Sequence, residues 1–197
     1  MSCAVVMGNR SVVLVHGFNV RDSGAGSTDL LKPPLEASGY VVSEFDYGWI
    51  GLLGAKVGAK RRAQALHSRH SSAYYAIGHS NGCALIWRAA WLGSFNVVVL
   101  LNPALDRDVQ WPPHLSGIHV YHTFGDMPTK LATYIPGVVW GSMGCRGALG
   151  GDHRIHNHRM DSPDLDPAVR ISSHSGIFGE ARDWWFDNIQ VEMARYW

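Results

Sequence analysis

The chain has 197 residues, of which 46% are hydrophobic and 17% are charged. It carries 17 Lys and Arg residues against 16 Asp and Glu residues, a formal net charge of +1 at pH 7. This balance argues against a nucleic-acid-binding protein, which carries a basic excess, and the apolar content excludes an intrinsically disordered chain. The length, with no visible linker, predicts one domain over 1–197.

The three cysteines, Cys3, Cys83 and Cys145, are widely spaced. An odd and dispersed set argues against a disulfide framework and favours a reducing compartment. The apolar start of the chain is too short for a signal peptide, and no stretch approaches the roughly 18 apolar residues that a membrane span needs. We therefore expect a soluble, cytoplasmic protein without a membrane span.

Apolar runs and helical patterns alternate along the first half of the chain. The expected strands are 11–15, 40–45, 73–77 and 96–101, and the expected helices are 28–38, 56–70 and 84–92. Such alternation predicts βα units that build a mainly parallel sheet. The nearly continuous apolar character of the runs indicates strands that are buried on both faces.

The second half gives weaker signals. A further strand is expected at 118–123 and a closing amphipathic helix at 180–196. Between them, 141–151 contains five glycines and the polar stretch that follows, to 167, has no clear period, so we predict a loop there. The apolar residues of 129–151 fit either a small flap over a site or a helix that faces the core.

The sequence Gly-His-Ser-Asn-Gly at 78–82 lies between an expected strand and an expected helix. A Gly-x-Ser-x-Gly motif in this context is typical of a nucleophile elbow, a strained turn that exposes the serine hydroxyl. Ser80 is therefore the candidate nucleophile. The backbone N–H of Asn81 is a candidate oxyanion donor at the start of the helix. The alternative is a Gly-Ser-Gly turn that only joins a strand to a helix.

A second motif, Val-His-Gly-Phe-Asn at 15–19, ends the first expected strand. With both motifs the chain resembles the α/β-hydrolase superfamily, as a small esterase-like or lipase-like member. The resemblance implies a three-layer α/β-hydrolase fold over 1–197, with a mainly parallel sheet and helices on both faces. Because 102–117 is too short for the helical cap of larger relatives, we expect a minimal fold without a large cap domain.

The resemblance also implies the remaining site residues. Its chain order of serine, acid and histidine points to Asp126, after the strand at 118–123, and to His174, before the closing helix. By position, the backbone N–H of Phe18 would be the second oxyanion donor. His79 is expected to pack in the elbow and not to act as the base. The alternative acids are Asp106 and Asp108, and the alternative bases are His153, His156 and His158.

The same three alternative histidines lie within six residues, a spacing that zinc could use. Two arginines next to them, Arg154 and Arg159, oppose the binding of another cation, so we expect a polar loop and no metal. The glycine-rich segment lacks the Gly-Lys-Ser/Thr ending of a phosphate loop, which argues against a nucleotide. No cofactor is therefore expected.

The function that these features favour is a serine hydrolase with a Ser80-His174-Asp126 triad. We expect it to cleave a small-molecule carboxylic ester through an acyl-enzyme, with no nucleic-acid partner. The alternatives are an acyltransferase, an amidase or peptidase of the same fold, and a non-catalytic binding protein built on that fold. The oligomeric state and the acyl-chain length of the substrate are left open by the sequence.

Overall fold

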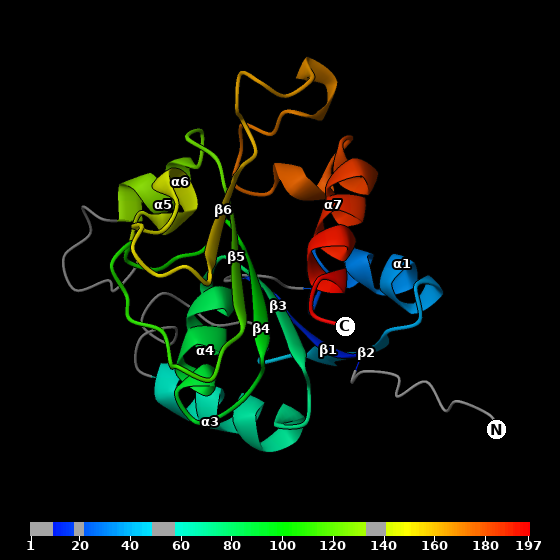
Figure 1. Ribbon diagram of the computed structural model, residues 1–197, viewed down its shortest axis with the longest axis vertical. Helices are drawn as coiled ribbons and strands as arrows, with labels where there is room; N and C mark the ends of the chain where they lie inside the picture. The colour runs from blue at the N-terminus through cyan, green and yellow to red at the C-terminus, as the bar shows by residue number, and fades with distance from the viewer. Residues whose placement is uncertain (1–9, 18–21, 49–57, 133–140) are drawn as a thin grey trace.

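The computed structural model describes residues 10–17, 22–48, 58–132 and 141–197 (Figure 1). Their strands form one six-stranded sheet in the order β2-β1-β3-β4-β5-β6, and the pairings between them are parallel. The strands are β1 (Ser11–Val15), β2 (Val41–Phe45), β3 (Tyr75–His79), β4 (Val97–Leu101), β5 (Gly117–His122) and β6 (Ile155–Arg159).

Helices cover both faces of this sheet. Figure 1 shows α3 (Ala59–His70) and α4 (Asn81–Ala90) on one side, and α1 (Lys32–Ala37) and α7 (Arg182–Ala194) on the other. The shorter helices are η1 (Thr28–Leu31), α5 (Met127–Ala132), α6 (Met143–Arg146), η2 (Pro167–Val169) and η3 (Gly176–Phe178). The predicted three-layer α/β architecture is confirmed.

The central strand β4 shows how the sequence builds two cores. All five of its residues are apolar and buried, because helices cover both faces of a parallel sheet. Val98 and Leu100 pack with α3 and α4, whereas Val97, Val99 and Leu101 pack with α1 and α7. Alternate side chains therefore belong to opposite layers, as the period of two in a strand requires.

The helix expected at 28–38 forms in two parts, η1 and α1. Pro33 and Pro34 lie in the first turn of α1, where a missing backbone N–H removes no intrahelical hydrogen bond. The closing helix is also confirmed, although α7 is shorter than the predicted range. The strand expected at 73–77 continues to His79, so the first two residues of the serine motif belong to β3.

The loop predicted for 141–167 is wrong in two places. The short helix α6 lies within the glycine-rich part, and β6 follows it. β6 pairs with β5 from Ile118 opposite Ile155 to His122 opposite Arg159. Its sequence, Ile-His-Asn-His-Arg, lacks the apolar alternation by which strands are recognised, because both faces carry polar residues, His156 and His158 on one and Asn157 and Arg159 on the other.

Residues 102–116, between β4 and β5, contain no helix or strand, so no cap is inserted at this point, as predicted. The segment 129–151, considered as a flap, lies partly outside the described residues, and Cys3 lies wholly outside them. Cys83 and Cys145 are buried free thiols. None of the helices in the described ranges has the length and apolar character to cross a membrane.

Candidate active site

Ser80 occupies the sharp turn between β3 and α4, with φ 53° and ψ −119°. A positive φ is strained for a residue with a side chain, typically by about 1–3 kcal/mol, and persists only where the surroundings enforce it. Backbone hydrogen bonds do so here. The Ser80 N–H donates to the carbonyl oxygen of Leu101 (2.9 Å), and the Ser80 carbonyl oxygen accepts from the N–H of Ala104 (3.2 Å).

The two glycines of the motif permit close packing around this turn. A Cβ atom at Gly82 would collide with the backbone oxygens of Val15 and His16, at the end of β1. A Cβ atom at Gly78 would lie 2.6 Å from Ile86 Cδ1 in α4. The helix α4 therefore begins directly against the sheet, and its first residue, Asn81, follows Ser80 immediately.

Asp126 and His174 meet across 48 residues of sequence. His174 Nδ1 lies 2.9 Å from each carboxylate oxygen of Asp126. Asp126 is fully buried, whereas the His174 side chain is 16% exposed. This arrangement fixes the ring orientation of a histidine that still reaches solvent, which is the geometry that a base in a triad requires.

Further donors hold the Asp126 carboxylate in its charged form. Asn102 Nδ2 donates to Oδ2 (3.1 Å), and the Thr129 N–H donates to Oδ1 (3.0 Å). Burial raises the pKa of Asp126, but the hydrogen bond and charge of His174, together with Thr129, outweigh burial. The pKa of Asp126 consequently lies below its ordinary value, and the buried carboxylate stays ionised.

The loop that carries Asp126 packs directly against the segment that carries His174. A Cβ atom at Gly125 would collide with the carbonyl oxygen of Ser172. Thr123 Oγ1, at the end of β5, donates to the carbonyl oxygen of Ile171 (2.7 Å). These contacts set the separation of the acid and the histidine through the backbone.

His79 links the elbow to His174. Its Nε2 lies 3.1 Å from the His174 carbonyl oxygen, and the two rings are 4.8 Å apart between centroids. Burial, and then the nearby His174, lowers the pKa of His79 to about 3, so its ring is neutral near pH 7. A neutral ring that donates from Nε2 positions the backbone of His174. In the described part of the chain, no hydrogen bond joins Ser80 Oγ to the His174 ring.

The other side of the elbow is formed by the turn after β1. The ring of His16 stacks on Tyr47 (4.2 Å between centroids, 14° between planes), and its Nε2 lies 3.2 Å from Asp46 Oδ1. The Tyr47 hydroxyl donates to the carbonyl oxygen of Gly17 (2.6 Å) and accepts from Asn81 Nδ2 (3.5 Å). Burial raises the pKa of Tyr47, so the hydroxyl keeps its proton. Phe18, the expected second oxyanion donor, lies outside the described residues.

The structure separates the alternative acids and bases from this group. Asp106 and Asp108 are exposed, and no hydrogen bond joins either one to a histidine in the described ranges. His153 is exposed in a turn, whereas His156 and His158 lie on β6 and pack around His119. Of the candidates considered, Asp126 and His174 are the acid and the histidine that contact each other.

Two neighbours of the site were missed by sequence reasoning. No sequence motif marks Tyr47, because its role depends on its contact with Gly17 in the turn after β1, which is distant in sequence. Asn102 directly follows β4 with φ 46°, a conformation that asparagine tolerates better than most residues. An asparagine at the carboxyl end of a predicted strand was the available signal, since such strand ends carry the functional groups of parallel sheets.

No protein-family model and no curated protein sequence matches this chain. Solved structures do. A candidate hydrolase of the alpha/beta superfamily from Xanthomonas campestris pv. campestris is 15% identical with a TM-score of 0.53, over 92% of this chain and 98% of that one. The esterase domain of a Rhodothermus marinus protein is 14% identical with a TM-score of 0.55, over 98% and 89%.

Lipase B of Aspergillus fumigatus is 14% identical with a TM-score of 0.53, over 90% of this chain and 51% of the lipase. The identities are low, and what the three structures share with this chain is the arrangement of strands and helices. The protein has the α/β-hydrolase fold that its two motifs predicted.

Proposed function

We propose that this protein is a serine hydrolase that cleaves small carboxylic esters, with Ser80 as nucleophile, His174 as base and Asp126 as its orienting acid. The observation that carries the proposal is the hydrogen bond between His174 and the buried Asp126 carboxylate, beside a serine held at positive φ. An ester is favoured over an amide because two proteins of similar fold are described as a lipase and an esterase.

The tautomer of His174 follows from its partner. A charged Asp126 accepts a hydrogen bond from Nδ1–H, which leaves the Nε2 lone pair free to take a proton. In the proposed reaction, Nε2 removes the Ser80 hydroxyl proton as Oγ attacks the ester carbonyl. The same proton passes to the alcohol that leaves, and an acyl-enzyme remains. In the second half of the reaction, His174 removes a proton from a water molecule that attacks the acyl-enzyme. That proton then passes to Ser80 Oγ, and the carboxylic acid is released. The serine–histidine bond is often long without substrate and tightens on binding.

The negative charge of the tetrahedral intermediate needs donors that are already in place. We assign this role to the backbone N–H groups of Asn81 and Phe18. Asn81 begins α4, where the helix dipole also favours negative charge. The Tyr47 hydroxyl holds the Gly17 carbonyl next to Phe18 and so restrains the turn from which the second donor comes.

A fluorophosphonate probe and a short p-nitrophenyl ester test the proposal. We expect the probe to label the wild-type chain and the ester to be hydrolysed, and Ser80→Ala to abolish both. Ser116→Ala is the matched control, because Ser116 is exposed at the far end of β4 and β5 and should label normally. A folded wild-type chain that is neither labelled nor active would overturn the assignment and favour a binding protein.

The nature of the acyl acceptor is tested separately. We expect free acid as the main product when the ester is incubated with competing alcohols or amines. A predominant ester or amide product would identify an acyltransferase, and faster cleavage of a matched p-nitroanilide would identify an amidase. Either result would contradict ester hydrolysis while leaving the triad intact.

A further inference from the structure

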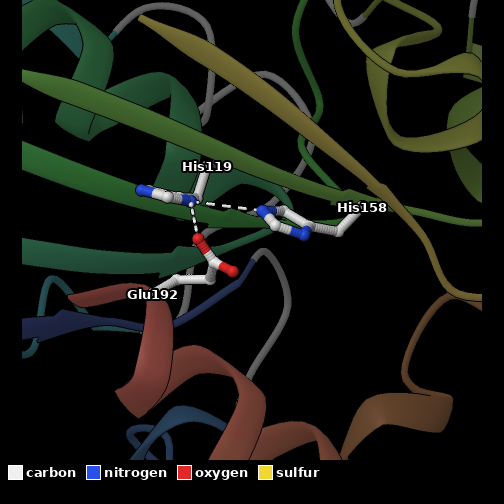
Figure 2. A group of neighbouring side chains, drawn as sticks. All are labelled: His119, His158 and Glu192. Carbon is white, nitrogen blue, oxygen red and sulfur yellow. Dashed lines mark hydrogen bonds and ion pairs between the residues drawn. The ribbon is translucent and has the colours of Figure 1, made fainter. Parts of the chain in front are cut away.

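Three side chains converge on the α7 face of the sheet, away from Ser80. His119 comes from β5, His158 from β6 and Glu192 from α7, and Figure 2 shows their polar ends directed toward one another. His119 Nδ1 lies 3.2 Å from His158 Nε2 and 3.7 Å from Glu192 Oε2. One nitrogen or oxygen atom of each residue lies within 4.8 Å of the other two.

The strand register creates this cluster. β5 and β6 pair so that His119 lies opposite His156, and Tyr121 lies opposite His158. The rings of His156 and His158 stack on His119 at 4.9 and 5.4 Å between centroids, and Tyr121 stacks on His158 at 4.4 Å. The two imidazoles that point at Glu192 are therefore held in place by packing before any ligand arrives.

The His119 ring has a hydrogen-bond partner outside the cluster. His119 Nε2 lies 3.1 Å from the Tyr196 hydroxyl, so an Nε2–H donor leaves the Nδ1 lone pair toward His158 and Glu192.

Of the two oxygens of the Glu192 carboxylate, only one has a hydrogen-bond partner among the described residues. Its Oε1 pairs with Arg195 at 3.0 Å, whereas the buried Oε2 has no hydrogen-bond donor among the described residues. A buried carboxylate oxygen without a donor is costly. Oε2 is the oxygen that faces His119, so a cation bound between these two residues would neutralise it.

We propose that His119, His158 and Glu192 bind a divalent transition-metal ion of the zinc type. Tetrahedral Zn²⁺ with bonds of about 2.0–2.1 Å holds its ligand atoms roughly 3.3 Å apart. His119 Nδ1 lies 3.2 and 3.7 Å from the other two ligand atoms, which lie within 4.8 Å of each other. Two imidazoles and one carboxylate suit zinc, whereas magnesium and calcium prefer all-oxygen sites. A water molecule would complete the coordination, and the hydrogen bond between His119 Nε2 and the Tyr196 hydroxyl would hold the ring in place.

The arginines that opposed a metal in the sequence do not face this cluster. Arg159 is an odd-numbered residue of β6, so its side chain leaves the strand on the face opposite to His156 and His158. It pairs with Asp161 at 2.9 Å, and Arg154 pairs with Asp152 at 2.6 Å. The three histidines His153, His156 and His158 lie in one segment, whereas the proposed site combines His158 with residues from two other elements.

The ion would fasten α7 to the edge of the sheet. His119 lies in the first half of β5, whereas Asp126 and Ser80 follow the carboxyl ends of β5 and β3. The proposed ion therefore lies away from the candidate triad, and we expect its binding to be independent of ester hydrolysis. Its expected effect is on stability, because an ion that binds the folded chain alone raises the free energy of unfolding.

Calorimetric titration of Zn²⁺ into the metal-free full chain tests the site. We expect one ion per chain, and an affinity that falls roughly 100-fold or more in His119→Gln and in Glu192→Gln. Even the loss of a residue that only hydrogen-bonds to a ligand costs about 10–100-fold. His156→Gln is the matched control. It lies on the same face of β6 and stacks on His119 but is not a ligand, and it should keep the wild-type affinity. Co²⁺ should give the visible absorption bands of tetrahedral coordination.

Two results would overturn the site. The first is a wild-type chain that binds no stoichiometric Zn²⁺. The second is binding that survives Glu192→Gln but is lost in His153→Gln, which would place the ion on exposed histidines. Glu192→Gln preserves side-chain shape, so it also serves if His119→Gln fails to fold. Zn²⁺ should raise the melting temperature of the wild-type chain and leave that of Glu192→Gln unchanged.

Discussion

Asp126 is the residue on which the geometry of the candidate triad depends. It has no contact with solvent and accepts hydrogen bonds from His174, Asn102 and the Thr129 backbone. The three donors fix the orientation of this buried carboxylate, and the carboxylate in turn fixes the orientation of the His174 ring. The sequence could place Asp126 after a strand but could not show these donors, which arrive from β4, α5 and the segment before η3.

Replacing this carboxylate by an amide tests its role. In Asp126→Asn the side chain can no longer accept from His174 Nδ1–H at both oxygens, so the ring loses its preferred tautomer. We expect kcat for a p-nitrophenyl ester to fall by about 10⁴-fold. The control is Asp106→Asn, which alters an exposed carboxylate and should leave kcat unchanged. Loss of turnover in the Asp106 variant alone would make the acid assignment wrong.

At the scale of elements, strands rich in β-branched and aromatic residues were predicted well. The strands β1, β2, β4 and β5 were each found within one residue of their limits, because each carries several such residues. β3 was predicted two residues too early in the chain, since Gly78 and His79 look like the start of a turn. β6 was missed because one of its faces carries histidines, whose stacking partner His119 is distant in sequence.

The docking of α4 on β1 depends on Gly82. Because an added Cβ would meet the backbone oxygens of Val15 and His16, Gly82→Ala must displace α4 or the end of β1. Overpacking of this kind costs about 1–3 kcal/mol, and we expect that loss in the free energy of unfolding, measured with urea. Gly150→Ala is the matched control, because nothing lies within 4 Å of its added Cβ. Equal stability of the two variants would rule out the close approach.

For the molecule as a whole, the candidate site comes from residues that a parallel sheet gathers at one end. Ser80 follows β3, Asp126 follows β5, and His174 precedes α7. Their order along the chain was visible in the motifs. What the motifs could not show is the packing between loops, such as Gly125 against Ser172. Such contacts depend on topology and side-chain volume, which no local pattern records.

The stability of the whole molecule should depend on pH through His79. This histidine is buried against His174 and near Asp126, and its pKa falls from an ordinary 6.5 to about 3. The unfolded chain therefore binds more protons than the folded chain between these values. The free energy of unfolding should decrease as pH falls through that window, by up to about 1.4 kcal/mol per pH unit from this group.

Urea unfolding of the wild-type chain and of His79→Asn, compared from pH 7 to pH 4, isolates this contribution. The variant is expected to show a shallower decline, because other titrating groups, including Asp126, are common to both proteins. The comparison uses the slope of the free energy of unfolding against pH, so a loss of stability that is the same at every pH does not affect it. Parallel curves would mean that His79 titrates alike in the folded and unfolded chains.

The polar sequence of β6 has a consequence for self-association. β6 is the last strand of the described sheet, so one side of its backbone faces no further strand. An open strand with apolar side chains is a template on which other copies of a chain can stack. β6 instead carries two histidines and an arginine, and Arg154 precedes it directly. We therefore expect the polar composition that concealed this strand in the sequence to disfavour edge-to-edge aggregation.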